Sequence, residues 1–313
     1  MNNFKNEALF VTHKLVLDAK KTLVSMVIEK IQEFLSWRNS TGNRTPSRQM
    51  YSVDVFGDSH PGQIRSVNQD CYFISNEMRV FVVADGLGGH KNGEIASSLA
   101  VKRFQHEMEG AHRKDGWFWP SNRELTNFDV ETGLIRSILH YAIMSAQRFL
   151  HQAILDDPNL QGMGTTLTAA IISNRILYVA HVGDSRVYLL RRNRLTQLTD
   201  DHSYARWLVR TGQITLEEAK THPGRNQLLQ SLGGEAISIA RRQEPLDISD
   251  RILLCTDGIS NMIPKERLYE ILTQQDATPQ SITSQLIYEA NSNGGRDNMT
   301  AIVISIKQNT VHE

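Results

Sequence analysis

Short apolar runs, each ended by turn residues, set the strongest limit on what the chain after Tyr51 can fold into. The runs are rich in Val, Ile, Leu and Tyr, as buried strands are. They cover residues 80–84, 166–172, 176–181, 187–191, 251–255 and 299–306. Longer stretches with helical spacing separate them, most clearly at 93–109, 132–155 and 279–292. The pattern therefore predicts a domain built from both strands and helices.

Very short turns join some of these runs. Asn174 and Arg175 separate the runs at 166–172 and 176–181, and Arg192 and Asn193 follow the run at 187–191. Because such short turns reverse the direction of a strand, at least part of the sheet is expected to be antiparallel. Helices grouped on antiparallel sheets indicate an α+β sandwich.

The composition argues against several classes of function. Among 313 residues there are 34 Lys and Arg against 34 Asp and Glu, so no net field draws the protein to nucleic acid or to an anionic membrane. The two cysteines, Cys71 and Cys255, are too few for a disulfide framework or a zinc cluster, which favours a reducing compartment. No uncharged run is long enough to span a bilayer. We expect a cytoplasmic protein with no transmembrane segment and no nucleic-acid partner.

Residues 1–49 differ in character from the rest of the chain. Between residues 15 and 37 the apolar positions have helical spacing, with charged residues among them, which predicts an amphipathic helix. These positions are Val16, Leu23, Val27, Ile31, Phe34 and Leu35. Residues 38–49 have the composition of a linker. The helix is expected either to pack on the main domain or on its own copy, or to act as a docking or regulatory arm. The main domain is expected at 50–308, with a tail at 309–313.

Aspartates border three of the apolar runs. Asp85 and Asp257, each followed by glycine, end two of them, and Asp297 stands just before the last. A carboxylate at the lip of a buried strand is partly desolvated and needs a cation as partner. Several such groups would repel one another unless divalent cations lay between them, and oxygen ligands without clustered Cys or His favour Mg²⁺ or Mn²⁺ over zinc. Since a single Asp-Gly is also a common turn dipeptide, this interpretation depends on the combination.

Six segments carry a resemblance to a known family. They are residues 62–70 (GQIRSVNQD), 84–90 (ADGLGGH), 162–166 (GMGTT), 182–186 (VGDSR), 255–258 (CTDG) and 296–298 (RDN). In this order, and spread over residues 51 to 306, they resemble the metal-dependent serine/threonine phosphatases of the 2C type, the PPM family, and its bacterial members in particular. The resemblance implies an α+β fold, a four-layer αββα sandwich of two mainly antiparallel sheets flanked by helices. It also implies a flap subdomain at about 201–234.

The resemblance implies a centre of two divalent cations, Mn²⁺ or Mg²⁺. In the family Asp85 bridges the two ions, the carbonyl of Gly86 binds one of them, and Asp257 and Asp297 complete the ligands of the other. Two ions about 3.5–4 Å apart can share a water, lower its pKa and direct it at phosphorus. No phosphoenzyme is then required. This agrees with the absence from the sequence of a C-x5-R thiol motif and of a D-x-D-x-T/V nucleophile motif.

Four further residues take roles from the resemblance. Arg65 matches the arginine that binds the substrate phosphate through paired donors. Asp70 matches the acidic residue that orients water beyond the direct metal ligands, and Asn298 is expected to support the site from outside the ligand sphere in the same way. Asp184 matches a position that helps to hold a weaker third ion. The alternative for Asp184 is a turn aspartate paired with Arg186.

The sequence departs from the animal members of the family at two positions. Gln69 stands where they have a metal-ligating glutamate, and Leu87 replaces the histidine proposed to protonate the leaving oxygen. Bacterial members share both changes, so activity is still expected. His90 and a metal-bound water remain alternatives for the acid that protonates the leaving group.

The expected flap subdomain contains a helix start. Thr215 and Glu218 have the spacing of a capping box, so at least part of the flap is expected to be ordered. His202, His222 and Arg225 are expected to be surface or capping residues. Because loops on a rigid scaffold often set recognition, the flap is a candidate for substrate selection.

Three functions compete. The leading hypothesis is an active phosphatase that hydrolyses phosphoserine and phosphothreonine in proteins and opposes a bacterial Ser/Thr kinase. The alternatives are a binding module that keeps the fold without metals, and a scaffold whose N-terminal helix recruits partners. The presence of Asp85, Asp257 and Asp297 argues against the binding module, because a degenerate copy would be free to lose any of them.

Overall fold

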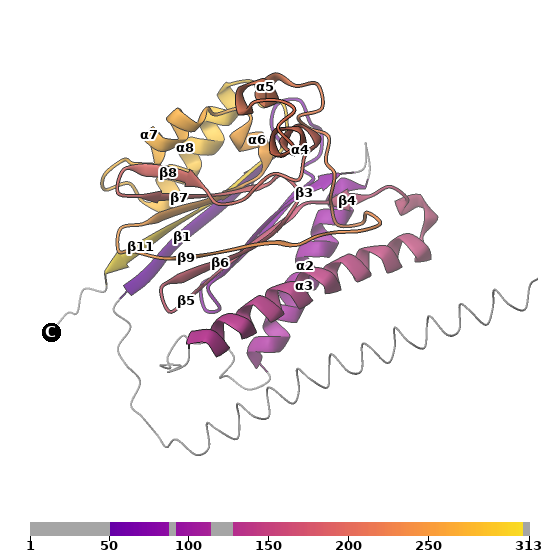
Figure 1. Ribbon diagram of the computed structural model, residues 1–313, viewed down its shortest axis with the longest axis horizontal. Coiled ribbons are helices and arrows are strands. Elements are labelled where there is room, and N and C mark those ends of the chain that lie inside the picture. Colours follow the sequence, from indigo (N-terminus) through magenta and orange to yellow (C-terminus); the bar gives the residue numbers. More distant parts are fainter. Residues whose placement is uncertain (1–50, 88–91, 114–127, 309–313) are drawn as a thin grey trace, which may run out of the picture. The chain divides into compact units, whose positions relative to one another are not determined.

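The computed structural model describes residues 51–87, 92–113 and 128–308 (Figure 1). The amphipathic helix expected at 15–37 and the side chain of His90 lie outside the described residues. Those expectations stay predictions, as do the boundaries of the segments at 1–49 and 309–313. Among the described residues, no helix combines the length and the apolar character that are needed to cross a membrane.

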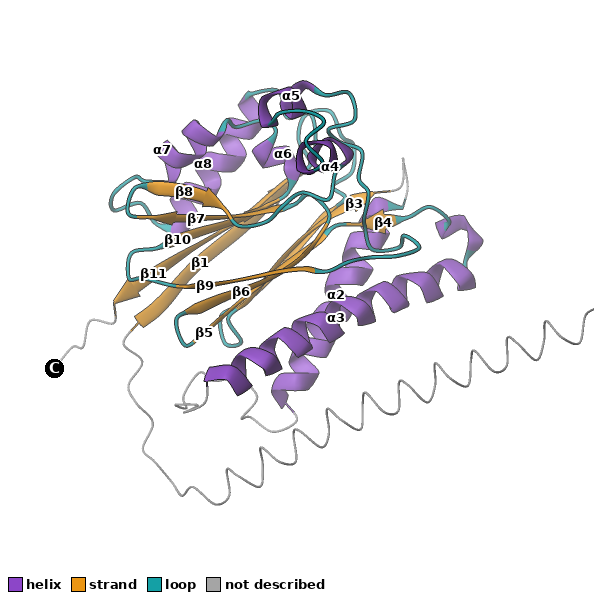
Figure 2. Cartoon of the chain, viewed as in Figure 1, coloured by secondary structure: helices purple, strands orange, loops and turns teal. Residues whose placement is uncertain are grey.

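Two antiparallel sheets form the centre of the domain (Figure 2). In order across the five-stranded sheet, the strands are β1 (Tyr51–His60), β11 (Met299–Gln308), β10 (Arg251–Cys255), β7 (Arg186–Arg191) and β8 (Arg194–Gln197). In the six-stranded sheet they are β2 (Asp70–Ser75), β3 (Val80–Leu87), β5 (Leu167–Ser173), β6 (Ile176–Val182) and β9 (Ala240–Pro245), with β4 (Gly164–Thr165) paired to β3. Every strand pair is antiparallel, as the short turns predicted.

Helices cover the outer face of each sheet. The long helices α2 (Gly93–Arg113) and α3 (Phe128–Asp156) pack on the six-stranded sheet, and α3 is followed by the short helix η1 (Pro158–Leu160). The helices α6 (Asp257–Ser260), α7 (Lys265–Leu272) and α8 (Pro279–Ser292) lie against the five-stranded sheet. Two small helices, α4 (Tyr204–Arg210) and α5 (Leu216–Thr221), belong to the segment between β8 and β9. The predicted four-layer α+β sandwich is confirmed.

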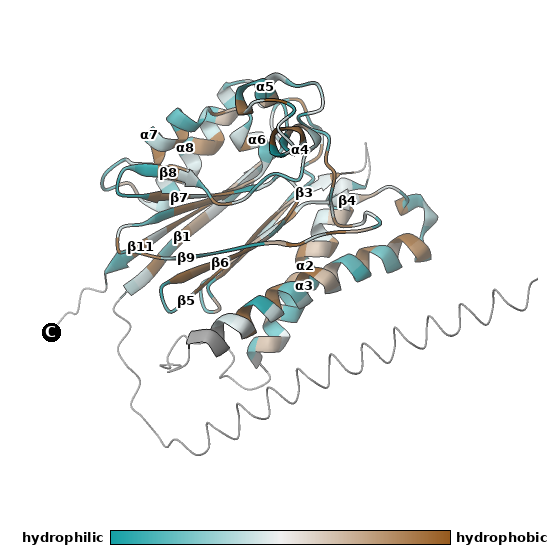
Figure 3. Ribbon diagram, viewed as in Figure 1, coloured by the Kyte–Doolittle hydropathy of each residue, from teal (hydrophilic) through white to brown (hydrophobic). Residues whose placement is uncertain are grey.

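The side chains of β3 alternate between two hydrophobic cores. The neighbouring strands β5 and β6 are coloured largely as hydrophobic in Figure 3. Val80 and Val82 pack beneath α2 and α3, whereas Phe81 and Val83 pack between the two sheets. All four are completely buried. Because both faces of this sheet are covered, its central strands read as continuous apolar runs.

Left-handed residues make the two predicted hairpin turns. Asn174 and Arg175 have φ of 46° and 59° between β5 and β6, and Arg192 and Asn193 have 45° and 60° between β7 and β8. Consecutive positive φ values are typical of the turn whose twist matches that of the flanking strands. The two hairpins therefore form where the sequence places them.

Candidate active site

Aspartates from both sheets meet at one end of the sandwich. Asp70 at the start of β2 pairs in register with Asp85 near the end of β3. Asp70 is also bound from the five-stranded sheet, because the hydroxyls of Thr256 and Thr300 donate to its Oδ2 at 2.8 and 2.6 Å. Thr256 directly precedes Asp257, which opens α6. The strand-end aspartates of the two sheets are thereby held together.

The carboxyl groups at this end repel one another. Burial raises the pKa of Asp85 well above its ordinary value, and the charges of Asp70, Asp257, Asp184 and Asp297 raise it further. The pKa of Asp257 is raised by burial and by Asp297, and a hydrogen bond to the side chain of Asp85 partly opposes the shift. Burial, Asp257 and Asp201 raise the pKa of Asp184. The carboxyl groups that were predicted to form one centre are therefore close enough for their charges to affect one another.

Asp70 is the most unusual of these carboxyls. Burial raises its pKa to about 7, although the hydrogen bonds from Thr300 and Thr256 act in the opposite direction and the charges of Asp257 and Asp297 add to the rise. Its Oδ1 is buried and has no hydrogen-bond partner among the described residues. A buried polar atom without a partner is costly, so this oxygen is suited to bind a water or another polar ligand.

The backbone around Asp85 is fixed by its neighbours. The amide of Asp85 donates to Oγ1 of Thr166 at 2.9 Å, and its carbonyl accepts from the amide of Thr166 and the hydroxyl of Thr165, both at 2.9 Å. Gly86 comes so close to Gly93 at the start of α2 that a Cβ would collide with the carbonyl group of Gly93. Only glycine fits at this position, which explains on steric grounds why Asp85 is followed by glycine.

Arg65 lies in the loop between β1 and β2, at the rim of the carboxyl cluster. Its Nη2 is 2.9 Å from Oδ2 of Asp297, and about half of its side chain is exposed. Asn298 fixes this loop at several points: its Nδ2 donates to the carbonyls of Pro61 and Val67, at 2.9 and 3.0 Å. Its Oδ1 accepts from the amide of Gln69 at 2.8 Å. Asn298 thus sets the position of the loop that carries Arg65.

Arg186 does not pair with Asp184. It forms a two-pronged ion pair with Asp201, with Nη2 at 2.6 Å from Oδ2, although its charge still lowers the pKa of Asp184. The alternative of an Asp184–Arg186 turn pair is therefore not what the structure contains. Asp184 directly follows the turn at Gly183, whose φ of +113° favours glycine, so this turn fixes the backbone of Asp184.

The flap contacts the same turn. The amide of Gly183 donates to Nδ1 of His202 at 3.2 Å, and the amide of His202 donates back to the carbonyl of Gly183 at 2.8 Å. The expected capping box is present, because the hydroxyl of Thr215 accepts from the amide of Glu218 and the Glu218 carboxylate accepts from the amide of Thr215. His222 caps the end of α5.

The donor set suits divalent cations, although the side chains are not arranged as a finished cage. No three His, Cys, Asp or Glu side chains of the described residues surround a common point. Two contacts account for this: Asp297 is turned to Arg65, and Asp85 is hydrogen-bonded to Asp257. The oxygen-only chemistry, the mutual repulsion and the partnerless Oδ1 of Asp70 fit hard cations such as Mg²⁺ or Mn²⁺.

Known proteins share this fold and sequence. Residues 56–285 match the family described as Protein phosphatase 2C. The serine/threonine phosphatase stp of Listeria welshimeri is 36% identical over 250 residues, which is 78% of this chain and 92% of that protein. The crystal structure of the Mycobacterium tuberculosis serine/threonine phosphatase PstP/Ppp has a TM-score of 0.70 at 31% identity, over 82% of this chain and 99% of that one. The catalytic domain of PstP, in complex with two manganese ions, has a TM-score of 0.68 at 30% identity, over 82% of this chain and all of that one, 100%.

The chain therefore belongs to the protein phosphatase 2C family, and it is a serine/threonine protein phosphatase. The predicted family and fold are confirmed. Thr256, Thr300 and Thr166 are contacts of the site that the sequence interpretation missed. The available signal was that all three lie within two residues of a motif aspartate or asparagine, or inside a motif itself.

Proposed function

We propose that this phosphatase removes phosphate from phosphoserine and phosphothreonine in proteins by direct attack of water, without a phosphoenzyme. The observation that carries the proposal is the gathering of Asp70, Asp85, Asp184, Asp257 and Asp297, because burial and the charges of neighbouring carboxylates raise the pKa values of the first four. Such a set of oxygens is a site for Mn²⁺ or Mg²⁺. The name of the stp relative and the two manganese ions of PstP support this assignment.

The roles proposed for the carboxylates are those that the resemblance to the family implies. Asp85, Asp257 and Asp297, with the carbonyl of Gly86, would hold two cations, and Asp184 would help to hold a weaker third. When bound, these ions supply charge neutralisation and a water of lowered pKa at the phosphorus. Asp70 accepts hydrogen bonds from Thr256 and Thr300 on Oδ2, so its other oxygen is set to orient the attacking water.

Arg65 is proposed to bind the substrate phosphate. It is exposed at the rim of the cluster, and its ion pair with Asp297 is made by Nη2, which leaves other donors for phosphoryl oxygens. When cations and substrate bind, the Asp297 carboxylate would exchange its contact with Arg65 for a cation. Arg65 would then be free to bind the substrate phosphate. Asn298 keeps the Arg65 loop in place during this exchange.

The cellular setting is also proposed. A protein phosphatase of this kind would oppose a Ser/Thr kinase, with phosphorylated proteins as its substrates. Cys71 and Cys255 are both free thiols, which suits the cytoplasm. The segment at 1–49 is proposed to mediate docking or self-association. Removal of residues 1–50 tests this role: unchanged turnover together with lost assembly or localisation would support it.

The test is manganese-dependent hydrolysis of para-nitrophenyl phosphate. We expect turnover with Mn²⁺, none in excess EDTA, and a loss of at least about 1000-fold in Asp257→Asn, because a ligand that acts in the transition state is removed. Asp156→Asn, at an exposed position on α3, is the matched control and should keep full activity. Turnover that survives EDTA, or a fully active Asp257→Asn enzyme, would contradict the mechanism. A folded protein that binds phosphopeptide without turnover would instead indicate the binding module.

A further inference from the structure

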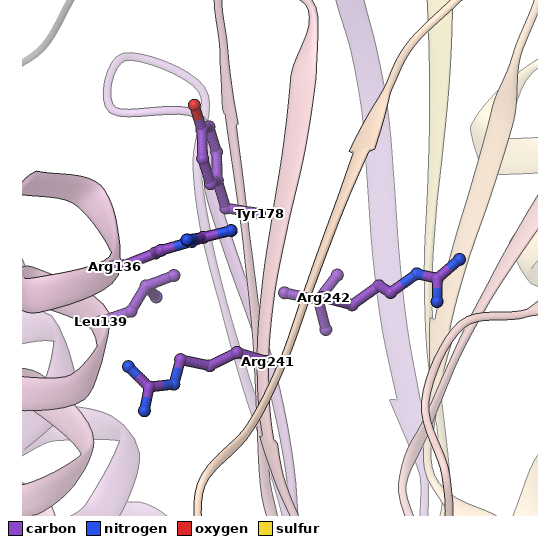
Figure 4. Close-up of a pocket in the computed structure, with 6 residues that line it drawn as sticks. Arg136, Leu139, Tyr178, Arg241 and Arg242 are labelled. Carbon is purple, nitrogen blue, oxygen red and sulfur yellow. The ribbon is translucent and has the colours of Figure 1, made fainter. Parts of the chain in front are cut away.

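The outer edge of the six-stranded sheet carries a concentration of positive charge. A small cavity there is lined by Arg136 and Leu139 from α3, by Tyr178 and Val179 from β6, and by Arg241 and Arg242 from β9 (Figure 4). None of these residues belongs to the carboxyl cluster or to the motifs of the family. The cavity therefore needs an explanation of its own.

Two of the arginines face each other across this cavity. Arg241 reaches from β9 toward α3, whereas Arg242 points to the opposite side of the strand (Figure 4), where it pairs with Glu244. Arg136 reaches from α3 toward β9 and donates from Nη2 to Oε1 of Gln243 at 2.7 Å. In the described part of the chain, neither Arg136 nor Arg241 is ion-paired with a carboxylate. Both guanidinium groups are thus exposed, and no carboxylate of the described residues neutralises them.

His140 adds to the same surface. It lies four residues after Arg136 on α3, so the two side chains share one face of the helix. Burial lowers the pKa of His140, and the positive charges of Arg241 and Arg148 lower it further. Arg241 and Arg148 can lower the pKa of His140 only because their positive charges lie close to its ring. A negatively charged group placed among them would relieve their repulsion.

The size and surroundings of the cavity indicate what kind of molecule would carry the negatively charged group. The cavity has a volume of about 30 Å³, room for one or two water molecules and hence for the tip of a side chain, not for a free cofactor. The strand β9 has β6 as its only strand partner among the described residues, and an unpaired strand edge is the kind of surface to which an extended peptide can add. An extended segment with Asp or Glu side chains would meet both features.

We propose that Arg136, His140 and Arg241 form a docking site for an acidic segment of the phosphoprotein substrate. This inference rests on the proposed phosphatase function. Arg241 pairs with Ala180, four residues before Asp184 along the chain, which is roughly 13 Å at about 3.3 Å per residue. A substrate that places its phosphate among the carboxylates would therefore carry its acidic residues about four to six positions away.

Other polyanions fit less well. Nucleic acid is held by many phosphate contacts, about 6–10 in a typical complex, and by a strongly basic face. This protein has equal numbers of acidic and basic residues, 34 of each, and the cluster offers two arginines and a histidine whose pKa is lowered. A carboxylate-bearing peptide needs no more than these.

The experiment compares two phosphothreonine peptides of equal length, with three Glu or three Gln residues placed from four to six positions from the phosphothreonine. For the unmodified protein with Mn²⁺, we expect KM to be roughly 3- to 10-fold lower for the Glu peptide, at equal kcat. Arg136→Ala/Arg241→Ala should raise KM for the Glu peptide to that for the Gln peptide. Turnover of para-nitrophenyl phosphate should not change, because that substrate has no acidic segment.

A charge exchange supplies the sharper test. Arg241→Glu should prefer a Lys peptide over the Glu peptide, whereas Arg194→Glu, at an exposed position on β8 of the other sheet, should keep the preference for Glu. Equal KM values for the Glu and Gln peptides in the unmodified protein, with normal para-nitrophenyl phosphate turnover, would overturn the docking site alone. Stronger competition by RNA or by phosphatidylserine vesicles than by a non-phosphorylated Glu peptide would overturn the choice of partner. Absence of all turnover would count against the phosphatase function itself.

Discussion

The carboxyl cluster and the arginine-lined edge each concentrate charge of one sign, but they differ in burial. The carboxyls of Asp70 and Asp85 lie where the two sheets meet, and burial is the largest cause of their raised pKa values. Arg241 lies on the outer edge of one sheet and Arg136 on the neighbouring helix α3, where solvent reaches both. In the described part of the chain, Arg65 and Arg186 offset only some of the charge of the carboxyl cluster, and neither Arg136 nor Arg241 is ion-paired.

This difference determines what each region can do. At a separation of 4 Å two unit charges interact by about 1 kcal/mol in water and by about 4 kcal/mol at the effective dielectric of a protein surface, and the interaction is larger still when the groups are buried. The carboxyl cluster would therefore need cations to remain ionised, which supports the proposal that it holds them permanently. The arginine edge is screened and tolerates being empty, which suits reversible contact with passing substrates.

Asp85→Asn should separate the two regions most strongly. At Mn²⁺ concentrations of about 100 times Kd, binding should stabilise the unmodified protein by about 2.7 kcal/mol and raise its Tm by several degrees. Asp85→Asn removes the carboxylate that is proposed to hold both ions, so this rise should vanish, whereas Arg136→Ala/Arg241→Ala should keep all of it. The measurement is thermal unfolding with and without Mn²⁺. An equal Mn²⁺-dependent rise in Asp85→Asn would mean that the ions are held elsewhere.

The sequence predicted the parts of the fold that are buried on both faces. Residues 251–255 and 279–292 match β10 and α8, because their apolar patterns are continuous or clearly helical. The strands β1, β2 and β9 were not predicted. β9 (ARRQEP) is an edge strand with exposed arginines, so it has neither an apolar run nor a clean alternation. Its place is set by pairing with β6, a contact that local sequence does not encode.

The residues of the site were predictable from motifs, but their interactions were not. The strand-end aspartates follow from the sequence, yet the pairing of Arg65 with Asp297 joins residues 232 positions apart. The same holds for Thr256 and Thr300, which bind Asp70 across 186 and 230 positions. These contacts form because the two sheets bring segments that are distant in the sequence to the same end of the sandwich. The roles of the predicted ligands stay predictions until the variants are measured.

Asp70→Asn tests the cost of the buried charge within the carboxyl cluster. In the metal-free protein the pKa of Asp70 is raised to about 7 from an ordinary 3.8, so its contribution to stability is complete below pH 4 and is lost as the pH rises through 7. Asn keeps an acceptor for Thr256 and Thr300 without the charge. Relative to the unmodified protein, the variant should gain up to about 4 kcal/mol between pH 4 and pH 8. Urea unfolding across this range measures the difference, and a gain independent of pH would contradict the shift.

The smallest expected effect is the response of the arginine edge to salt, and it separates exposed charge from buried charge. Because the Debye length falls from about 10 Å at 0.1 M to about 3 Å at 1 M, the few-fold KM preference for the Glu peptide should disappear in 1 M NaCl. The activity defect of Asp257→Asn should stay the same in both salts, since a missing ligand is not a screened interaction. Para-nitrophenyl phosphate turnover at each salt concentration controls for effects on the carboxyl cluster. A peptide preference that persists in 1 M NaCl would show that Arg136 and Arg241 act as a desolvated pocket, and the contrast between the two regions would then be one of sign and not of burial.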